Sequence, residues 1–221
     1  MTKGSRAQTA FNECIFRTFT IAHLTDNEMY ESLINYMNAH ASKPMNEDEV
    51  ELVKNIFVPR RIRKRQYFLQ EGDVSKHMGF IVKGAMRKYS VDDKGVEHIV
   101  SFYIENWWAG DRESFTRLTP SLYNVEAWED TDLLTLTKAD SVELFSIPAM
   151  SELARQLDDN HSFASQKRIN AAISQTAEQR YATFADSYPE FLQRFPQHMI
   201  ASYLGITKET LSRVRSQAVK K

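Results

Sequence analysis

Short runs of apolar and β-branched residues, separated by turn signals, fill the middle of this 221-residue chain. Asp92–Asp93–Lys94–Gly95 has the composition of a short hairpin turn, and Gly84 closes another run. Because the runs follow one another with few helices between them, they predict a small antiparallel roll or barrel. The predicted strands cover residues 67–69, 77–84, 86–91, 96–104, 123–128 and 133–136.

Both flanks of this region carry helical signals. After Met29, apolar residues recur at helical spacing, and Asn46 with Glu49 has the capping pattern of a second short helix. Beyond the strands, residues 138–145 predict a short helix, and Pro148 is placed to begin a long helix of about seven turns. We therefore expect an α+β protein, in which an antiparallel β-roll with flanking helices precedes a long connecting helix and a helical C-terminal segment.

This pattern divides the chain into four segments. Residues 1–28 lack comparable organisation and are interpreted as an N-terminal extension, either flexible and disordered or produced by an upstream start codon chosen in error. Residues 29–147 form the roll domain, residues 148–176 the connecting helix and residues 177–221 the C-terminal helical domain.

Composition excludes several classes of function. The single cysteine, Cys14, rules out a disulfide framework, a cysteine-rich zinc site and an iron–sulfur cluster. No apolar run approaches the roughly 20 residues that span a bilayer, and the N-terminus makes a poor signal peptide, so we expect a cytoplasmic protein with no membrane partner.

His77 and His98 lie on neighbouring predicted strands, but without a His-x-His pair or carboxylate we expect no metal. With no catalytic constellation, we expect no enzyme.

Two short helices joined by a glycine turn are predicted near the C-terminus. Gly205 stands where a left-handed residue ends the first helix, and Thr207 can cap the second. This layout is typical of a helix-turn-helix, in which apolar faces of both helices pack together. The expected apolar residues are Ile200, Ala201 and Leu204 in the first helix and Leu211, Val214 and Ala218 in the second.

The opposite face of the second helix is polar and suits the major groove of double-stranded DNA. Arg213 can donate to guanine O6 and N7, Glu209 can accept from cytosine N4, and Ser212 is permissive. From residue 197 to the end, five basic residues against one acidic give 5 − 1 = +4, although the whole chain carries −1. Positive charge is thus concentrated where phosphates would be met. The residues that we expect to contact DNA are Thr207, Lys208, Glu209, Ser212, Arg213 and Lys220.

Residues 29–221 resemble the Crp/Fnr family of transcription regulators. Residues 68–73 (Phe-Leu-Gln-Glu-Gly-Asp) and 79–84 (Gly-Phe-Ile-Val-Lys-Gly) are similar to the family's first roll strands, and residues 208–213 (Lys-Glu-Thr-Leu-Ser-Arg) resemble its recognition helix. The resemblance implies a cyclic-nucleotide-binding-type β-roll, a long dimerisation helix and a DNA-binding domain. It also implies base reading by the recognition-helix residues named above, a homodimer, contact with RNA polymerase and an unknown small-molecule effector.

The connecting helix carries an apolar seam made of Met150, Leu153 and Leu157. As a coiled coil the seam is weak, because the same heptad continues with polar residues. From the spacing alone, the seam packs either on the chain's own roll or on a second copy. The resemblance favours the second copy, and so assigns the seam to the dimer interface.

The sequence departs from cyclic-AMP-binding members of the family at the phosphate cassette. Those members carry a Gly-Glu pair and then an Arg followed by a small residue. Here Gly110–Asp111 resembles the pair with one methylene less, and Ser121 stands in place of the Arg, so the bidentate phosphate partner is lost. We therefore expect no cyclic-nucleotide cofactor. The residues that remain candidates for another ligand are Gly110, Asp111, Arg112, Ser121 and Tyr123.

A second departure concerns the end of the sequence. Family members continue past the recognition helix into a small β-hairpin wing, whereas this sequence stops a few residues after Arg215, so we expect no wing. Lys220 and Lys221 would replace part of its phosphate contacts. One alternative function stays open at this point: a small-molecule-sensing β-roll whose helical tail binds a protein instead of DNA.

Overall fold

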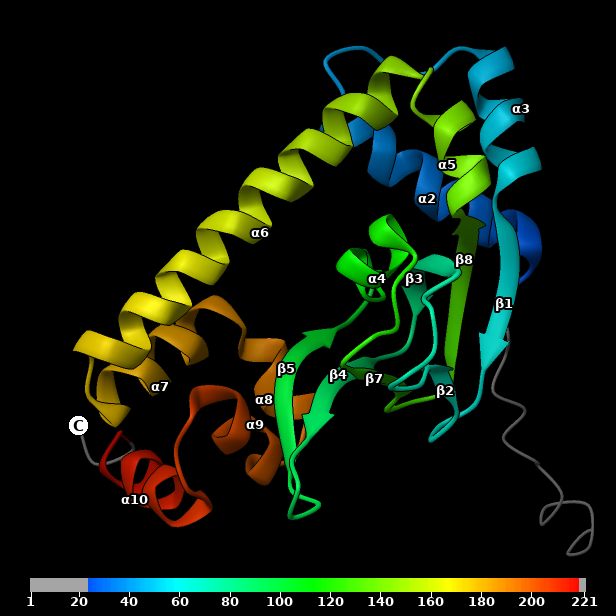
Figure 1. The fold of residues 1–221 in the computed structure, drawn as a ribbon. Coiled ribbons are helices and arrows are strands. Elements are labelled where there is room, and N and C mark those ends of the chain that lie inside the picture. The colour runs from blue at the N-terminus through cyan, green and yellow to red at the C-terminus, as the bar shows by residue number, and fades with distance from the viewer. Residues whose placement is uncertain (1–23, 219–221) are drawn as a thin grey trace, which may run out of the picture.

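The computed structural model describes residues 24–218, with side chains for residues 24–217 (Figure 1). Helices precede and follow a run of strands, as expected for an α+β fold. The strands are β1 (Val58–Ile62), β2 (Tyr67–Leu69), β3 (His77–Lys83), β4 (Met86–Val91), β5 (Glu97–Tyr103), β6 (Trp108–Ala109), β7 (Asn124–Ala127) and β8 (Thr131–Thr137). The helices are α2 (Asp26–His40), α3 (Glu47–Ile56), α4 (Arg112–Arg117), α5 (Lys138–Leu144), α6 (Pro148–Ser174), α7 (Ala177–Ser187), α8 (Pro189–Arg194), α9 (Gln197–Leu204) and α10 (Lys208–Ala218).

Two antiparallel sheets of four strands each form the predicted β-roll. Their strand orders are β1-β8-β3-β6 and β2-β7-β4-β5. The predicted hairpin turn joins β4 to β5, and the Asp92 carboxylate accepts the backbone N–H groups of Lys94 and Val96 there. The inner faces of the two sheets enclose an apolar core that includes Ile81 and Leu133. Strands β1 and β6 and helix α4 are absent from the elements predicted above, because β6 has only two residues and β1 contains Pro59 and two arginines.

Helices α2, α3 and α5 cover one end of the roll. The predicted capping pair is confirmed, since the Asn46 side chain accepts the N–H of Glu49 and Glu49 accepts the N–H of Asn46. The boundary placed after residue 28 needs a correction. Thr25 and Glu28 form a second capping box that begins α2, so residues 25–28 belong to the folded structure. Residues 1–23, the rest of the expected extension, lie outside the described residues.

The long helix α6 begins at Pro148, as expected, and crosses the molecule diagonally (Figure 1). Its apolar seam does not face outward. Met150 and Leu153 are buried in the same cluster as Met29, Leu33 and Met37, and Leu157 packs against that cluster. The assignment of this seam to a dimer interface is therefore wrong. It packs on the chain's own N-terminal helices, because α2 offers an apolar face that the sheets alone do not cover.

Helices α7 to α10 form a compact group that rests on the outer face of β4 and β5 (Figure 1). One apolar cluster joins the two parts, and Phe102 of β5 lies at its centre, with ring centroids 4.2 Å from Phe195 and 5.5 Å from Phe191. Ser202 of α9 accepts the N–H of Ile99 at 2.9 Å. The helical group therefore shares its core with the roll.

An ion-pair cluster borders this shared core. Arg194, at the end of α8, donates to Glu105 and Glu129 in two turns of the roll, and the Trp128 indole donates to the backbone carbonyl of Arg194. Burial alone would raise the pKa of Glu105, but the hydrogen bonds from Arg194 and the backbone outweigh it and hold the pKa below its usual value. The Glu105 carboxylate therefore stays ionised at neutral pH, and Arg194 binds both it and Glu129.

Candidate nucleic-acid interface

Helices α9 and α10 have the geometry of a helix-turn-helix. Gly205 ends α9 in the left-handed region (φ 65°, ψ 39°), and the N–H of Ile206 returns to the carbonyl of Ala201 at 3.0 Å. A side chain in that conformation would be strained, so glycine is suited to the turn. The turn directs Leu211 and Val214 of α10 against the buried face of α9. The predicted apolar faces are confirmed, except that the side chain of Ala218 lies outside those described.

Thr207 caps α10 as expected. Its hydroxyl accepts the N–H of Thr210 at 3.2 Å, which satisfies one of the free donors at the start of the helix. The outward side of α10 is polar. All five described candidates for DNA contact are exposed on it: Thr207, Lys208, Glu209, Ser212 and Arg213. The sixth candidate, Lys220, lies outside the described residues.

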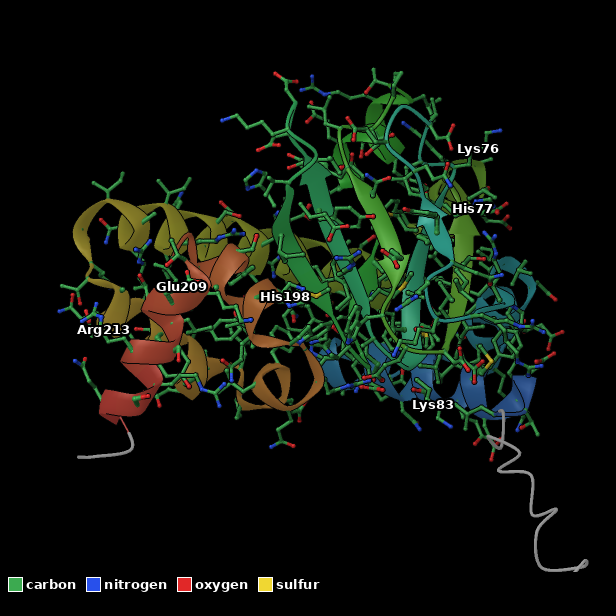
Figure 2. The ribbon with its side chains drawn as sticks, turned by 90° about the horizontal axis from the view of Figure 1, so that it is seen from below. Lys76, His77, Lys83, His198, Glu209 and Arg213 are labelled. Atoms are coloured by element: carbon green, nitrogen blue, oxygen red, sulfur yellow. The ribbon has the colours of Figure 1, made fainter. Side chains whose placement is uncertain are left out.

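Glu209 and Arg213 follow one another along α10 at the far end of the molecule from His77 (Figure 2). They are four residues apart, so they occupy neighbouring turns of one helix face. Arg213 is engaged by Glu178 of α7, with Nη2 to Oε1 at 3.3 Å. The backbone N–H and the Thr176 hydroxyl hold the pKa of Glu178 below its usual range, and Arg213 adds to this effect. A guanine base would therefore have to displace an ionised carboxylate.

Inside the roll, the two cassette positions meet. The Ser121 hydroxyl donates to the Asp111 carboxylate at 2.7 Å, and both residues are buried. The ammonium group of Lys88, from β4, lies 3.1 Å from the other Asp111 oxygen and 4.1 Å from the centre of the Tyr123 ring. Burial lowers the pKa of Lys88 although Asp111 opposes the shift. Ser121, which stands where cyclic-AMP-binding members carry arginine, is thus part of an internal polar cluster. We call this set of Lys88, Asp111, Ser121 and Tyr123 the Lys88–Asp111 cluster.

The remaining ligand candidates take other roles. Gly110 adopts φ 145°, where any other residue would be strained, and a Cβ there would also require the Met78 side chain to move. Arg112 instead pairs with Asp158 of α6. The structure therefore brings together Asp111, Ser121 and Tyr123 but not Arg112.

Lys88 was not among the residues expected at this site, although the sequence carries a signal for it. In a strand, residues two apart face the same side. Lys88 follows Met86 by two positions, and Met86 is fully buried in the roll core. A lysine in register with a core methionine indicates an inward charge that needs a partner.

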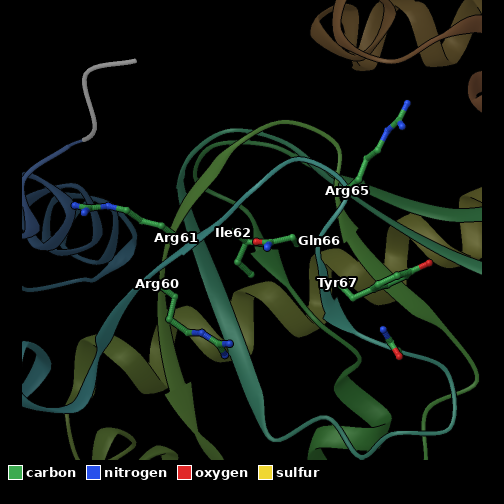
Figure 3. Close-up of a pocket in the computed structure, with 7 residues that line it drawn as sticks. Arg60, Arg61, Ile62, Arg65, Gln66 and Tyr67 are labelled. Carbon is green, nitrogen blue, oxygen red and sulfur yellow. The ribbon is translucent and has the colours of Figure 1, made fainter. Parts of the chain in front are cut away.

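Two other constellations considered at the sequence level do not form sites. His77 lies on β3 and His98 on β5, in different sheets, so the expectation that they occupy neighbouring strands is wrong. The basic run at residues 60–65 begins within β1, which is an edge strand, and continues past its end. Arg60, Arg61 and Arg65 line a surface groove, and the side chains of Arg61 and Arg65 extend in opposite directions (Figure 3). Arg61 pairs with Asp26 and Asp132.

Comparison with known proteins gives a consistent result. Residues 59–147 match the model of the cyclic nucleotide-binding domain. The chain is 27% identical to the fumarate and nitrate reduction regulatory protein of Yersinia pestis, over 77% of this chain and 72% of that protein. It is 24% identical to the transcriptional activator protein anr of Pseudomonas aeruginosa, over 70% and 68%. The structure of FixK2 from Bradyrhizobium japonicum superimposes with a TM-score of 0.61 at 20% identity, covering 75% of this chain and 85% of that one.

A β-roll, a long connecting helix and an exposed helix-turn-helix together define a class of two-part DNA-binding regulators. Within that class, the relatives are named as anaerobic regulators and transcriptional activators. Residues 59–147 thus match a cyclic nucleotide-binding domain, and the chain as a whole is similar to Crp/Fnr-type transcription regulators.

Proposed function

We propose that this regulator binds double-stranded DNA sequence-specifically as a homodimer, and that α10 is its recognition helix. Glu209, Ser212 and Arg213 would contact base edges, and Thr207, Lys208 and Lys220 would contact phosphates. Such a protein acts in the cytoplasm, where it meets the chromosome and RNA polymerase. The unknown effector, if the roll takes one, would be small.

One observation carries this proposal above the others. The apolar side of α10 is fixed against α9, while its polar side projects into solvent with no part of the roll in front of it. A helix presented in this way can enter the major groove without a change in its backbone packing, once Arg213 exchanges Glu178 for a base. A tail that bound a protein through the same helix would be expected to expose apolar anchors, whereas the described exposed side chains of α10 are polar or charged.

The first test is the salt dependence of binding to duplex DNA. We expect affinity for a duplex selected from genomic fragments to fall steeply between about 50 and 200 mM salt, because each phosphate contact releases counterions. Fluorescence anisotropy at several salt concentrations measures the slope. A flat dependence, or no binding to any selected fragment, would favour the protein-binding alternative for the helical tail.

Dimer formation is supported by the far half of α6. Residues 159–174 are almost entirely exposed, including the large apolar side chains of Phe163, Ile169 and Ile173. At about 100° per residue, these three fall within roughly one third of the helix circumference. That stripe lies opposite Met150, Leu153 and Leu157, which face the roll. A long helix with a second, uncovered apolar stripe is suited to pairing with the same helix of another copy.

We expect Ile173→Glu to weaken this dimer. Ile173 is 81% exposed in the single chain, and a carboxylate placed against the partner's helix would have to be buried without a cation. Sedimentation velocity should show a shift from dimer to monomer. Ala172→Glu, which adds the same charge one position away on the helix surface, should leave the dimer intact. A dimer that tolerates both substitutions equally would place the interface elsewhere.

We also expect no response to cyclic nucleotides. The Lys88–Asp111 cluster leaves the cassette aspartate already satisfied, and no guanidinium lies at the family's phosphate position. Isothermal titration calorimetry with cyclic AMP and cyclic GMP should detect no binding in the micromolar range. Micromolar binding of either nucleotide would contradict this prediction and indicate that Lys88 leaves Asp111 to bind the phosphate.

A further inference from the structure

The face of α6 that rests on the roll ends in an arginine that touches three separate parts of the molecule. Arg168 donates from Nη1 to the carbonyl of Val100 at 2.6 Å, and from Nη2 to the carbonyls of Ile99 at 3.3 Å and Tyr203 at 3.1 Å. Its guanidinium also stacks 4.1 Å from the centre of the Tyr203 ring. One side chain on the connecting helix thus contacts β5 of the roll and α9 of the helix-turn-helix.

The three acceptors are backbone carbonyls at the margins of their own elements. Strand β5 is the edge of its sheet, so carbonyls on its open side have no neighbouring strand. Tyr203 lies in the last turn of α9, where carbonyls cannot bond within the helix and the dipole favours a cation. The planar fork of a guanidinium can serve several such acceptors at once, whereas a lysine ammonium would act as a single point charge.

The position of Arg168 on α6 gives these contacts a geometrical consequence. It lies on the roll-facing side of the helix, in line with Met150, Leu153 and Leu157, and opposite the exposed stripe that we assign to the dimer. Tyr203 stands two residues before the Gly205 turn that aims α10. A shift of α9 relative to α6 would therefore move the recognition helix relative to the dimer axis.

We propose that Arg168 is a positioning residue that fixes α9 and α10 relative to the dimerisation helix, and so sets which separation of DNA half-sites the dimer accepts. This inference rests on the proposed function, because half-site separation has meaning only for a dimer that reads an inverted repeat. Arg168 acts through α9 and is not itself a DNA contact.

The test measures affinity for a set of duplexes that carry the same two half-sites with zero, one or two base pairs inserted between them. Wild-type protein should prefer one separation and lose about tenfold in affinity for each departure, because half-site spacing is fixed by the rigid dimer. Arg168→Met keeps the aliphatic stem but removes every hydrogen bond, and should reduce this discrimination to about threefold or less. Arg168→Lys should behave in an intermediate way.

Lys167→Met is the matched control, since it removes the same charge from the adjacent residue, about 100° around the helix. It should keep the wild-type spacing profile. Circular dichroism and sedimentation check that every variant is folded and dimeric, and if Arg168→Met is not, Arg168→Lys decides the outcome. A wild-type preference that survives in both Arg168 variants would overturn the positioning role alone. A wild-type protein with no preference for separation would overturn the proposed dimeric reading, and the positioning role with it.

Discussion

Phe102→Ala is expected to destabilise the whole protein by about 3–5 kcal/mol, the range for removing a buried phenylalanine. Phe102 is 1% exposed, and its ring lies between those of Phe191, Phe195 and Tyr203. Truncation would open a cavity between β5 and the helical group, which neither part can close by itself. Urea unfolding, followed by far-UV circular dichroism and tryptophan fluorescence, measures the loss.

Val91→Ala on the neighbouring strand is the control for this experiment. Val91 is 39% exposed, so its truncation should change the free energy of unfolding by no more than about 0.5 kcal/mol. Because Trp107 and Trp128 flank the shared core, their fluorescence reports on it directly. A Phe102 variant as stable as wild type would mean that the helical group and the roll do not share one cooperative core.

Arg213→Ala is expected to cost about 1–3 kcal/mol of binding free energy at the selected DNA site and to relax the preference at one base pair. The guanidinium can reach guanine O6 and N7 together, and no shorter side chain replaces that pair of bonds. In the free protein Arg213 pairs with Glu178, so this carboxylate competes with guanine for the guanidinium. Anisotropy with the selected duplex and with single-base variants of it gives the loss at each position.

Lys220→Ala provides the contrast, because a phosphate contact carries no sequence information. It should weaken binding to all duplexes alike and lower the slope of the salt dependence by about one unit. Equal losses for selected and scrambled duplexes in the Arg213 variant would show that α10 is not in the major groove. The helix-turn-helix would then bind phosphates only, and sequence-specific regulation would lose its main structural support.

Local features of this fold could be predicted from sequence because neighbouring residues decide them. Gly205 ends α9 because its backbone can adopt the left-handed conformation. Thr207 caps α10 by accepting the N–H of Thr210, three residues later, and Asn46 pairs with Glu49 within one turn. The hairpin at residues 92–95 closes through the Asp92 carboxylate. Each of these signals acts within about five residues, so no knowledge of distant partners was needed.

Features that depend on distant partners were missed or assigned wrongly. The seam at Met150, Leu153 and Leu157 has the same spacing whether it meets another copy or its own α2, and only packing distinguishes the two. The Lys88–Asp111 cluster joins residues 23 positions apart. One local feature was also missed: the capping box of Thr25 and Glu28 lies ahead of Met29, where the apolar helical spacing begins.

The sequence by itself determined the class of this protein, since the alternating strands, the long uninterrupted helix and the glycine turn follow from local conformational preferences. The tertiary structure decided which surfaces remain available. It buries one apolar side of α6 on the roll and leaves the opposite side open, and it joins β5, α6 and α9 through Arg168. Burial is a property of the assembled chain: a side chain's exposure depends on elements that can lie far away in sequence, and their arrangement is set by the core that they share.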